Sequence, residues 1–303
     1  MFGFTFHAVR FTLLLLDLQV CEAYVTTFVG RLLNACETNR SLLCVGLDPD
    51  PTRMPIGDVV AFNSAIVDAT RDLVCAYKPN VGFYEARGSE GIRELERTIA
   101  HIRDVAPSVM VLVDGKRGDI GSTNAAYAKA LFEMWGADAA TINGYAGGAD
   151  LGPFLAYEGK AVFVWCRSSN EGAAELQDLP VQSDGATIPF YQALAQRAVE
   201  WGPNGSVGLV VGATYPKELA EVRTIAPDAP ILLPGVGAQE GSMRASVEAG
   251  VDRAGRNLLV SSSRGVLYAS SDPVSYADAA RNAAERLREQ INAVLEAGGH
   301  SWS

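Results

Sequence analysis

The sequence predicts an α/β protein built as a single-domain closed (β/α)8 TIM barrel. Eight short apolar or β-branched runs recur along the 303 residues, and segments of helical periodicity separate most of them. Strands that alternate with helices pair in parallel. No linker rich in Pro, Ser or charge interrupts the series, and such barrels commonly form one domain of about 250 residues. A closed barrel is therefore favoured over an open doubly wound sheet.

The predicted strands cover residues 42–47, 73–77, 109–113, 139–142, 161–165, 207–211, 231–233 and 258–260. Each is a run of apolar or β-branched residues, and the fourth is short and rich in Ala. The first strand ends in Val-Gly-Leu-Asp-Pro-Asp. An open sheet that binds a dinucleotide would instead be expected to show a Gly-x-Gly-x-x-Gly turn at this point.

Two helices illustrate the periodicity. Apolar residues recur at Ile92, Leu95, Ile99 and Ile102, after a possible N-cap at Ser89. The last helix carries apolar positions between Leu287 and Leu295 and ends at Gly298.

The barrel is expected to span residues 29–298, between a leader at residues 1–28 and a tail at residues 299–303. The apolar run of the leader is interrupted by Asp17 and is too short to cross a bilayer, so we expect a poorly ordered or peripheral segment rather than a signal peptide. Residues 167–187 form a polar connection longer than a routine βα loop. This length suggests a lid, with a surface insertion as the alternative.

The net charge and the cysteine and histidine content limit the kinds of ligand and site that the protein can have. A net charge of −10 argues against nucleic acid and anionic membranes, yet it permits an anionic small ligand held by local N–H groups and an Arg. The five cysteines include no C-x-x-C pair, and three of them, Cys44, Cys75 and Cys166, lie in or beside apolar strand-like runs. These three are expected to be core residues in a reducing compartment, and the protein is expected to be cytoplasmic. None of the three histidines lies at a strand end, so neither acid–base chemistry by His nor a metal site with His ligands is expected.

Polar residues follow nearly every predicted strand. The carboxyl ends of barrel strands face one pocket, so these residues are expected to meet there. They are Asp48, Lys78, Asp114, Lys116, Asn143, Ser169, the turn at residues 235–239 that contains Gln239, and Arg264. The glycine-rich turn and Arg264 follow the seventh and eighth strands, where barrels commonly bind a phosphate. The sequence therefore predicts a phosphate site at this end.

The third strand ends in a cluster of charge. Asp114, Lys116 and Asp119, together with Lys78 from the second strand, are expected to form an alternating array in which each charge stabilises its neighbour. Lys116 would then stay protonated. A Schiff-base lysine needs the opposite environment, so proton donation by Lys116 is favoured over imine chemistry.

The motif Asp114-x-Lys116-x-x-Asp119, with Lys78 in Tyr-Lys-Pro-Asn, closely resembles the orotidine 5′-phosphate decarboxylase family. The resemblance extends to Leu-Asp-Pro around Asp48, Asp-Ile-Gly-Ser-Thr, Arg-Ser-Ser-Asn, Pro-Gly-Val-Gly-Ala-Gln and Ser-Ser-Arg-Gly, all in family order. The spacing and the last motif resemble the bacterial type 2 subgroup. Coverage runs from about Val29 to the C-terminal helix.

The resemblance implies the conversion of orotidine 5′-monophosphate to UMP and CO2, the last step of de novo pyrimidine synthesis, without cofactor or metal. It implies that Lys116 protonates C6 as the carboxylate leaves and that Asp114 lies against that carboxylate. Lys78 would orient Asp114 and contact the ribose, whose hydroxyls Asp48 would bind.

The resemblance also implies how the rest of the nucleotide is held. Ser169 would contact the pyrimidine, and Gln239 and Arg264 would bind the phosphate. Asp119 and Thr123 would cross the interface of a homodimer and complete the partner's site.

Two features depart from the family pattern. Glu171 stands where the family often has Pro, which bears on the conformation of the lid, and the leader is an extension.

Two alternative functions remain open. They are a Mg²⁺-dependent sugar-phosphate decarboxylase or aldolase of the same superfamily, and a catalytically silent phosphate-binding barrel. The lack of a strand-end His disfavours the first, and the complete set of two lysines and two aspartates disfavours the second.

Overall fold

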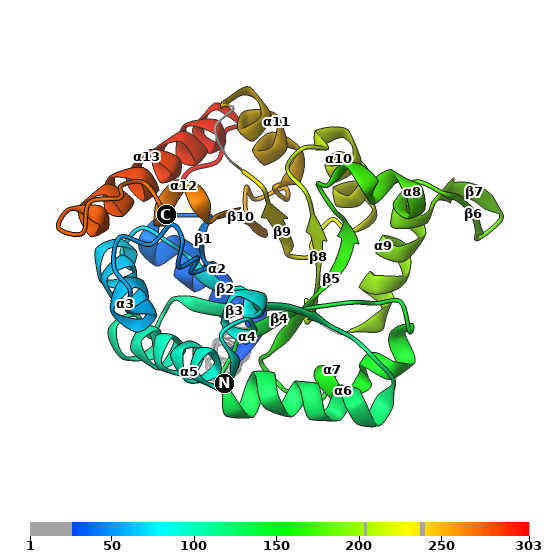
Figure 1. The fold of residues 1–303 in the computed structure, drawn as a ribbon. Helices are drawn as coiled ribbons and strands as arrows, with labels where there is room; N and C mark the ends of the chain where they lie inside the picture. Colours follow the sequence, from blue (N-terminus) through cyan, green and yellow to red (C-terminus); the bar gives the residue numbers. More distant parts are fainter. Residues whose placement is uncertain (1–25, 203–204, 237–239, 303) are drawn as a thin grey trace, which may run out of the picture.

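The computed structural model describes residues 26–202, 205–236 and 240–302 and confirms the closed barrel of parallel strands (Figure 1). The strands follow one another around the barrel as β1 (Leu43–Leu47), β10 (Leu258–Ser262), β9 (Ile231–Pro234), β8 (Val207–Val211), β5 (Ala161–Arg167), β4 (Ala139–Ile142), β3 (Met110–Arg117) and β2 (Ala76–Pro79). Nearly all strand residues are buried, as expected when helices cover a parallel sheet.

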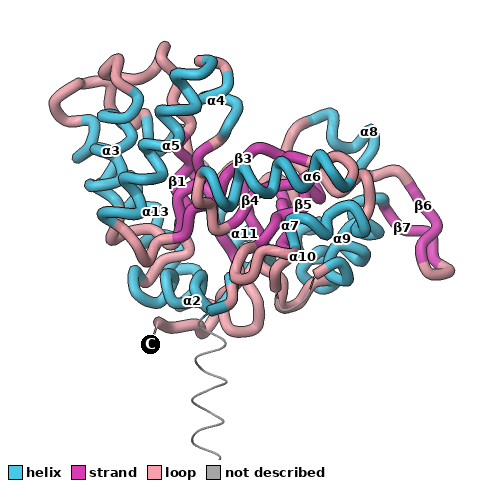
Figure 2. Tube along the Cα trace, turned by 90° about the horizontal axis from the view of Figure 1, so that it is seen from below, coloured by secondary structure: helices cyan, strands magenta, loops and turns pink. Residues whose placement is uncertain are grey.

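Helices surround the strands (Figures 1 and 2). In the described part of the chain the longer ones are α2 (Phe28–Asn39), α3 (Val59–Thr70), α5 (Gly88–Val105), α6 (Gly121–Ala128), α9 (Phe190–Trp201), α10 (Pro216–Ile225), α11 (Glu240–Gly250) and α13 (Tyr276–Ala297). Short helices are α4 (Val81–Glu85), α7 (Gly152–Leu155), α8 (Ala174–Gln177) and α12 (Arg264–Leu267), and a π-helix, Lys129–Met134, continues α6. None of these helices combines the length and apolar character needed to span a bilayer.

Two local predictions need correction. The second strand begins at Ala76, because Leu73 and Val74 are buried in the turn after α3, and an apolar run alone does not separate a buried turn from a strand. Helix α5 begins at Gly88, whose φ of 64° turns the chain there, so Ser89 lies inside the helix and is not its N-cap. The last helix ends before Gly298 as predicted.

The long connection after β5 has secondary structure of its own. A 3-10 turn (Glu171–Ala173) and α8 are followed by an antiparallel hairpin of β6 (Pro180–Ser183) and β7 (Ala186–Pro189). The hairpin projects away from the barrel (Figure 1). A lid over all of residues 167–187 is therefore not what the structure shows, because only the part next to β5 remains at the barrel mouth.

The amino ends of the strands carry a separate buried charge network. Asp138, at the start of β4, is 2% exposed and accepts hydrogen bonds from Arg31 at 2.7 Å, from Arg103 at 2.6 Å and from the Val111 backbone at 2.9 Å. Burial opposes the charge of Asp138, but Arg103 and these donors still lower its pKa. In (β/α)8 barrels this end serves stability, which leaves the carboxyl ends of the strands for function.

Candidate active site

A cavity of about 490 Å³ lies at the carboxyl ends of the strands. Four of the predicted site residues line it: Asp48, Lys78, Asp114 and Arg264. Its volume falls within the range of about 300–1,000 Å³ that is usual for small-molecule sites. Asp48 directly after β1 meets residues of β2, β3 and the ends of β9 and β10 in it, as predicted from the strand ends.

Asp114 lies between two ammonium groups. Lys78 Nζ lies 3.1 Å from Asp114 Oδ2, and Lys116 Nζ lies 2.8 Å from Asp114 Oδ1. The side chains of Lys78 and Asp114 are 5% and 9% exposed, whereas that of Lys116 is 35% exposed. Lys116 is therefore the ammonium that remains more accessible.

The ionisation of this group follows from its burial and its neighbours. Burial alone would raise the pKa of Asp114, but Lys78 and Lys116 hold that pKa far below its usual range. Burial likewise opposes the charge of Lys78, yet the attraction of Asp114 and Asp48 raises the pKa of Lys78 above its ordinary value. Both members of the pair are consequently charged at neutral pH.

The end of β3 is distorted where it presents Lys116. The pairing with β4 shifts register between Val113 and Arg117, and Lys116 itself has a φ of 45°, a conformation that non-glycine residues rarely adopt. Thr141 Oγ on β4 accepts hydrogen bonds from the backbone of Gly115 and Lys116, at 3.1 and 3.0 Å. It donates to Asp114 Oδ1 at 2.7 Å. The Thr141 hydroxyl thus holds in place both the irregular end of β3 and the Asp114 carboxylate.

Asp48 offers an acceptor to a ligand. Its Oδ1 is buried without a hydrogen-bond partner among the described residues, and the side chain lines the cavity beside Lys78. A buried oxygen without a donor is costly to folding. A ligand hydroxyl would satisfy it.

Another part of the cavity lining has the character of an anion site. Ser263, Arg264 and Gly265 line it where β10 leads into α12. Gly46 of β1 allows this turn to approach closely, because a Cβ at Gly46 would lie 1.9 Å from Ser263 Oγ. The predicted partner Gln239 lies outside the described residues. Arg53 and Tyr268 also line this part and were not predicted.

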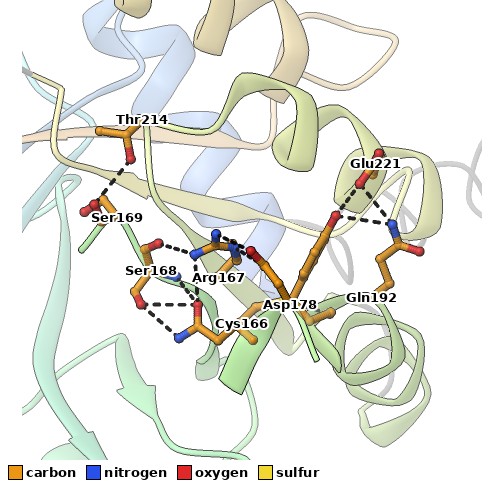
Figure 3. A network of polar contacts seen from close by, with 10 residues as sticks. Cys166, Arg167, Ser168, Ser169, Asp178, Gln192, Thr214 and Glu221 are labelled. Carbon is orange, nitrogen blue, oxygen red and sulfur yellow. Dashed lines mark hydrogen bonds and ion pairs between the residues drawn. The ribbon is translucent and has the colours of Figure 1, made fainter. Parts of the chain in front are cut away.

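Ser169 is placed by a network at the end of β5 (Figure 3). Arg167 is 1% exposed, forms an ion pair with Asp178 at 3.1 Å and stacks over the ring of Tyr215 at 4.1 Å. Its guanidinium also donates to the Ser168 carbonyl at 2.9 Å. Ser169 lies against the ends of the neighbouring strands, since a Cβ added to Gly212 would be 2.6 Å from Ser169 Cβ.

Asp119 does not join the array within its own chain, so the predicted cluster of four charges is corrected to Lys78, Asp114 and Lys116. Asp119 is exposed, and its Oδ1 accepts a hydrogen bond from the Ile120 backbone at 2.6 Å. The chain has left the strand at Gly118, which carries Asp119 beyond the pocket. Thr123 follows on α6, half-buried, and does not line the cavity either.

Comparison with known proteins identifies the family. The model of the family described as "Orotidine 5'-phosphate decarboxylase / HUMPS family" matches residues 41–280. The chain belongs to the orotidine 5′-phosphate decarboxylase family. It is 47% identical over 272 residues to the orotidine 5′-phosphate decarboxylase of Ralstonia pickettii, covering 88% of this chain and 98% of that one. The enzyme of the same name from Thermomicrobium roseum is 49% identical over 275 residues, covering 88% and 96%.

A solved structure of the family agrees with the fold. The OMP decarboxylase of Leishmania donovani superposes with a TM-score of 0.76 at 39% identity, over 88% of this chain and 98% of that one. The predicted membership in the orotidine 5′-phosphate decarboxylase family is therefore confirmed.

Sequence reasoning missed two residues of the site, Thr141 and Trp165, which contact Asp114 and Lys116. Thr141 is the one hydroxyl in the Ala-rich run of β4, and a polar residue one position before a strand end was the available signal. Trp165 lies 37% exposed in an otherwise buried strand, and its ring centroid is 5.7 Å from Lys116 Nζ. Thr141 and Trp165 therefore belong to the site, because Thr141 contacts Asp114 and Trp165 contacts Lys116.

Thr141→Val is expected to lower the decarboxylase turnover about tenfold or more, because it removes the donor to Asp114 and the acceptor that fixes Lys116. Thr141→Ser keeps the hydroxyl and should retain most of the turnover. Steady-state kinetics of the two variants, with melting temperatures to verify folding, measure the effect. Equal turnover in the Val and Ser variants would contradict this role for Thr141.

Proposed function

We propose that the protein decarboxylates orotidine 5′-monophosphate to UMP and CO2, the final step of de novo pyrimidine synthesis. The observation that carries the proposal is the buried Asp114 carboxylate held between Lys78 and Lys116, in a cavity that Arg264 also lines. The Lys116 ammonium and the Arg264 guanidinium match the two acidic groups of this substrate. Membership in the decarboxylase family supports the assignment.

The reaction needs a cation next to the carbon that loses CO2. The bond between C6 and the carboxylate breaks, the electron pair remains on C6, and no electron sink in the substrate accepts it. The Lys116 ammonium stabilises this charge and then gives C6 its proton, and solvent returns a proton to Lys116. Asp114 lies against the substrate carboxylate, and its enforced ionisation favours departure of the like charge as CO2.

The remaining residues hold the nucleotide. Lys78 orients Asp114 and contacts the ribose, while Asp48 accepts from the ribose hydroxyls through the oxygen that lacks a partner. Ser169 contacts the pyrimidine, and Arg264 with Gln239 binds the phosphate. Phosphate binding far from C6 supplies free energy that can position the reacting end.

The active unit is proposed to be a homodimer in which Asp119 and Thr123 complete the partner's site. Support comes from the position of Asp119, which is exposed and forms no ion pair with the described residues of its own chain. Two large apolar side chains are also exposed: Ile120, the residue after Asp119, at 63%, and Tyr145, in the loop after β4, at 90%. Such side chains are typical of surfaces that become buried on association.

The protein is proposed to act in the cytoplasm and to need neither cofactor nor metal. The four cysteines within the described residues, Cys36, Cys44, Cys75 and Cys166, are buried free thiols, which suits a reducing compartment. The proton donor and the stabilising charges of the proposed mechanism are side chains of the chain itself.

The purified protein should convert orotidine 5′-monophosphate to UMP at a rate that EDTA does not change. The ultraviolet absorbance of the substrate reports the reaction, and chromatography identifies UMP. Unchanged absorbance would contradict the proposed function. Activity that disappears with EDTA and returns with Mg²⁺ would instead favour a sugar-phosphate enzyme of the same superfamily.

Mixing Lys116→Ala subunits with Asp119→Ala subunits should restore activity to roughly a quarter of the wild-type value. Half of the randomly formed dimers are mixed, and each contains one intact site if Asp119 acts in trans. The matched control is Lys116→Ala mixed with Asp114→Ala, which leaves no intact site. Equal recovery in both mixtures, or none in the first despite verified subunit exchange, would contradict the shared site.

A further inference from the structure

A second guanidinium faces the cavity beside Arg264. Arg53 lies in the connection between β1 and α3 and lines the same cavity as Arg264. Its backbone is fixed by a turn, in which the Arg53 N–H donates to the Asp50 carbonyl at 2.9 Å. The side chain is exposed and forms no ion pair within the described part of the chain.

Tyr268 holds this guanidinium in place. The Arg53 Cζ lies 4.3 Å from the centroid of the Tyr268 ring, within the range of a cation–π contact. The Tyr268 hydroxyl donates to the Asp48 carbonyl at 2.6 Å and accepts from the Asp50 N–H at 2.7 Å. The ring also stacks with Phe62, at 6.1 Å between centroids. Arg53 therefore rests on a ring that is fixed to the end of β1.

Two of the other charged groups around the cavity, Lys78 and Asp50, have partners of their own, and the Arg53 guanidinium is available to an anionic ligand. Its described lining contains three carboxylates and three cations: Asp48, Asp50, Asp114, Arg53, Lys78 and Arg264. Lys78 is committed to Asp114 at 3.1 Å. Asp50 Oδ1 accepts hydrogen bonds from the Thr52 backbone N–H at 2.9 Å and from the Thr52 hydroxyl at 2.7 Å.

A phosphate monoester brings a charge of about −2 into this part of the cavity. Arg264 alone offsets half of it, and a second guanidinium offsets the rest. Arginine suits this task because its planar donors pair with phosphate oxygens.

We propose that Arg53 is a second phosphate-binding residue, which contacts the 5′-phosphate of the nucleotide together with Arg264. This inference rests on the proposed function, since it concerns the substrate of the same site. Arg53 acts on affinity and on the choice of phosphorylated over unphosphorylated ligands. It takes no part in the chemistry at C6.

The test compares Arg53→Ala, Arg264→Ala and the matched control Arg93→Ala, an exposed Arg on α5 that pairs with Glu90 away from the cavity. Arg53→Ala should raise KM and weaken inhibition by UMP about tenfold, as expected for one charged hydrogen bond. Its kcat at saturation should stay within about twofold of the wild-type value. Inhibition by uridine, which lacks the phosphate, should not change, and Arg93→Ala should behave as the wild type.

The role of the ring is tested with Tyr268→Phe and Tyr268→Leu. The Phe variant keeps the face on which Arg53 rests, so its UMP affinity should exceed that of the Leu variant severalfold. In a Tyr268→Leu background, Arg53→Ala should then cost less UMP affinity than it does in the wild type. An equal cost in both backgrounds would contradict the positioning by Tyr268.

Two outcomes separate this inference from the proposed function. If Arg264→Ala weakens UMP binding and Arg53→Ala leaves it unchanged, the inference is wrong and the proposed phosphate site stands. If wild-type protein fails to distinguish UMP from uridine, the proposed function itself fails, and the inference falls with it. An equal loss of UMP and uridine affinity in Arg53→Ala would also overturn the inference, because it would indicate a general distortion of the cavity.

Discussion

The interaction on which the site depends is the pairing of one buried carboxylate with two ammonium groups. Asp114 is charged despite burial because Lys78 and Lys116 contact its two oxygens. The side chains of Lys78 and Asp114 are only 5% and 9% exposed, so the attraction between them is stronger than it would be at the surface. The irregular end of β3 and the Thr141 hydroxyl maintain this geometry at the cost of an unfavourable backbone conformation at Lys116.

The two ends of the barrel have different roles: the amino ends of the strands contribute to stability, and the carboxyl ends form the binding cavity. At the amino ends of the strands both oxygens of the buried Asp138 carboxylate accept hydrogen bonds, from Arg31, Arg103 and a backbone N–H. At the carboxyl ends, among the described residues, the cavity has a buried Asp48 oxygen without a hydrogen-bond donor and an Arg53 without an ion pair. A buried oxygen without a donor costs free energy, and a nucleotide hydroxyl that donates to it recovers that cost.

Sequence reasoning predicted the barrel and the residues at its strand ends because both follow from periodicity and chain order. It did not predict contacts that depend on three-dimensional packing. The role of Thr141 depends on the register between β3 and β4, and that of Arg53 depends on a ring more than two hundred residues away in the sequence. Proximity in sequence predicts Asp119 in the array, but β3 ends at Arg117, before the chain reaches Asp119.

The central claim is that Lys116 supplies the proton while the other groups bind and orient the nucleotide. It is tested most directly by measuring turnover and UMP affinity together in Lys116→Ala. We predict that turnover falls by at least about a thousandfold, whereas the dissociation constant for UMP changes by less than about fivefold. Turnover within about tenfold of the wild type, in a variant that still binds UMP, would contradict the account.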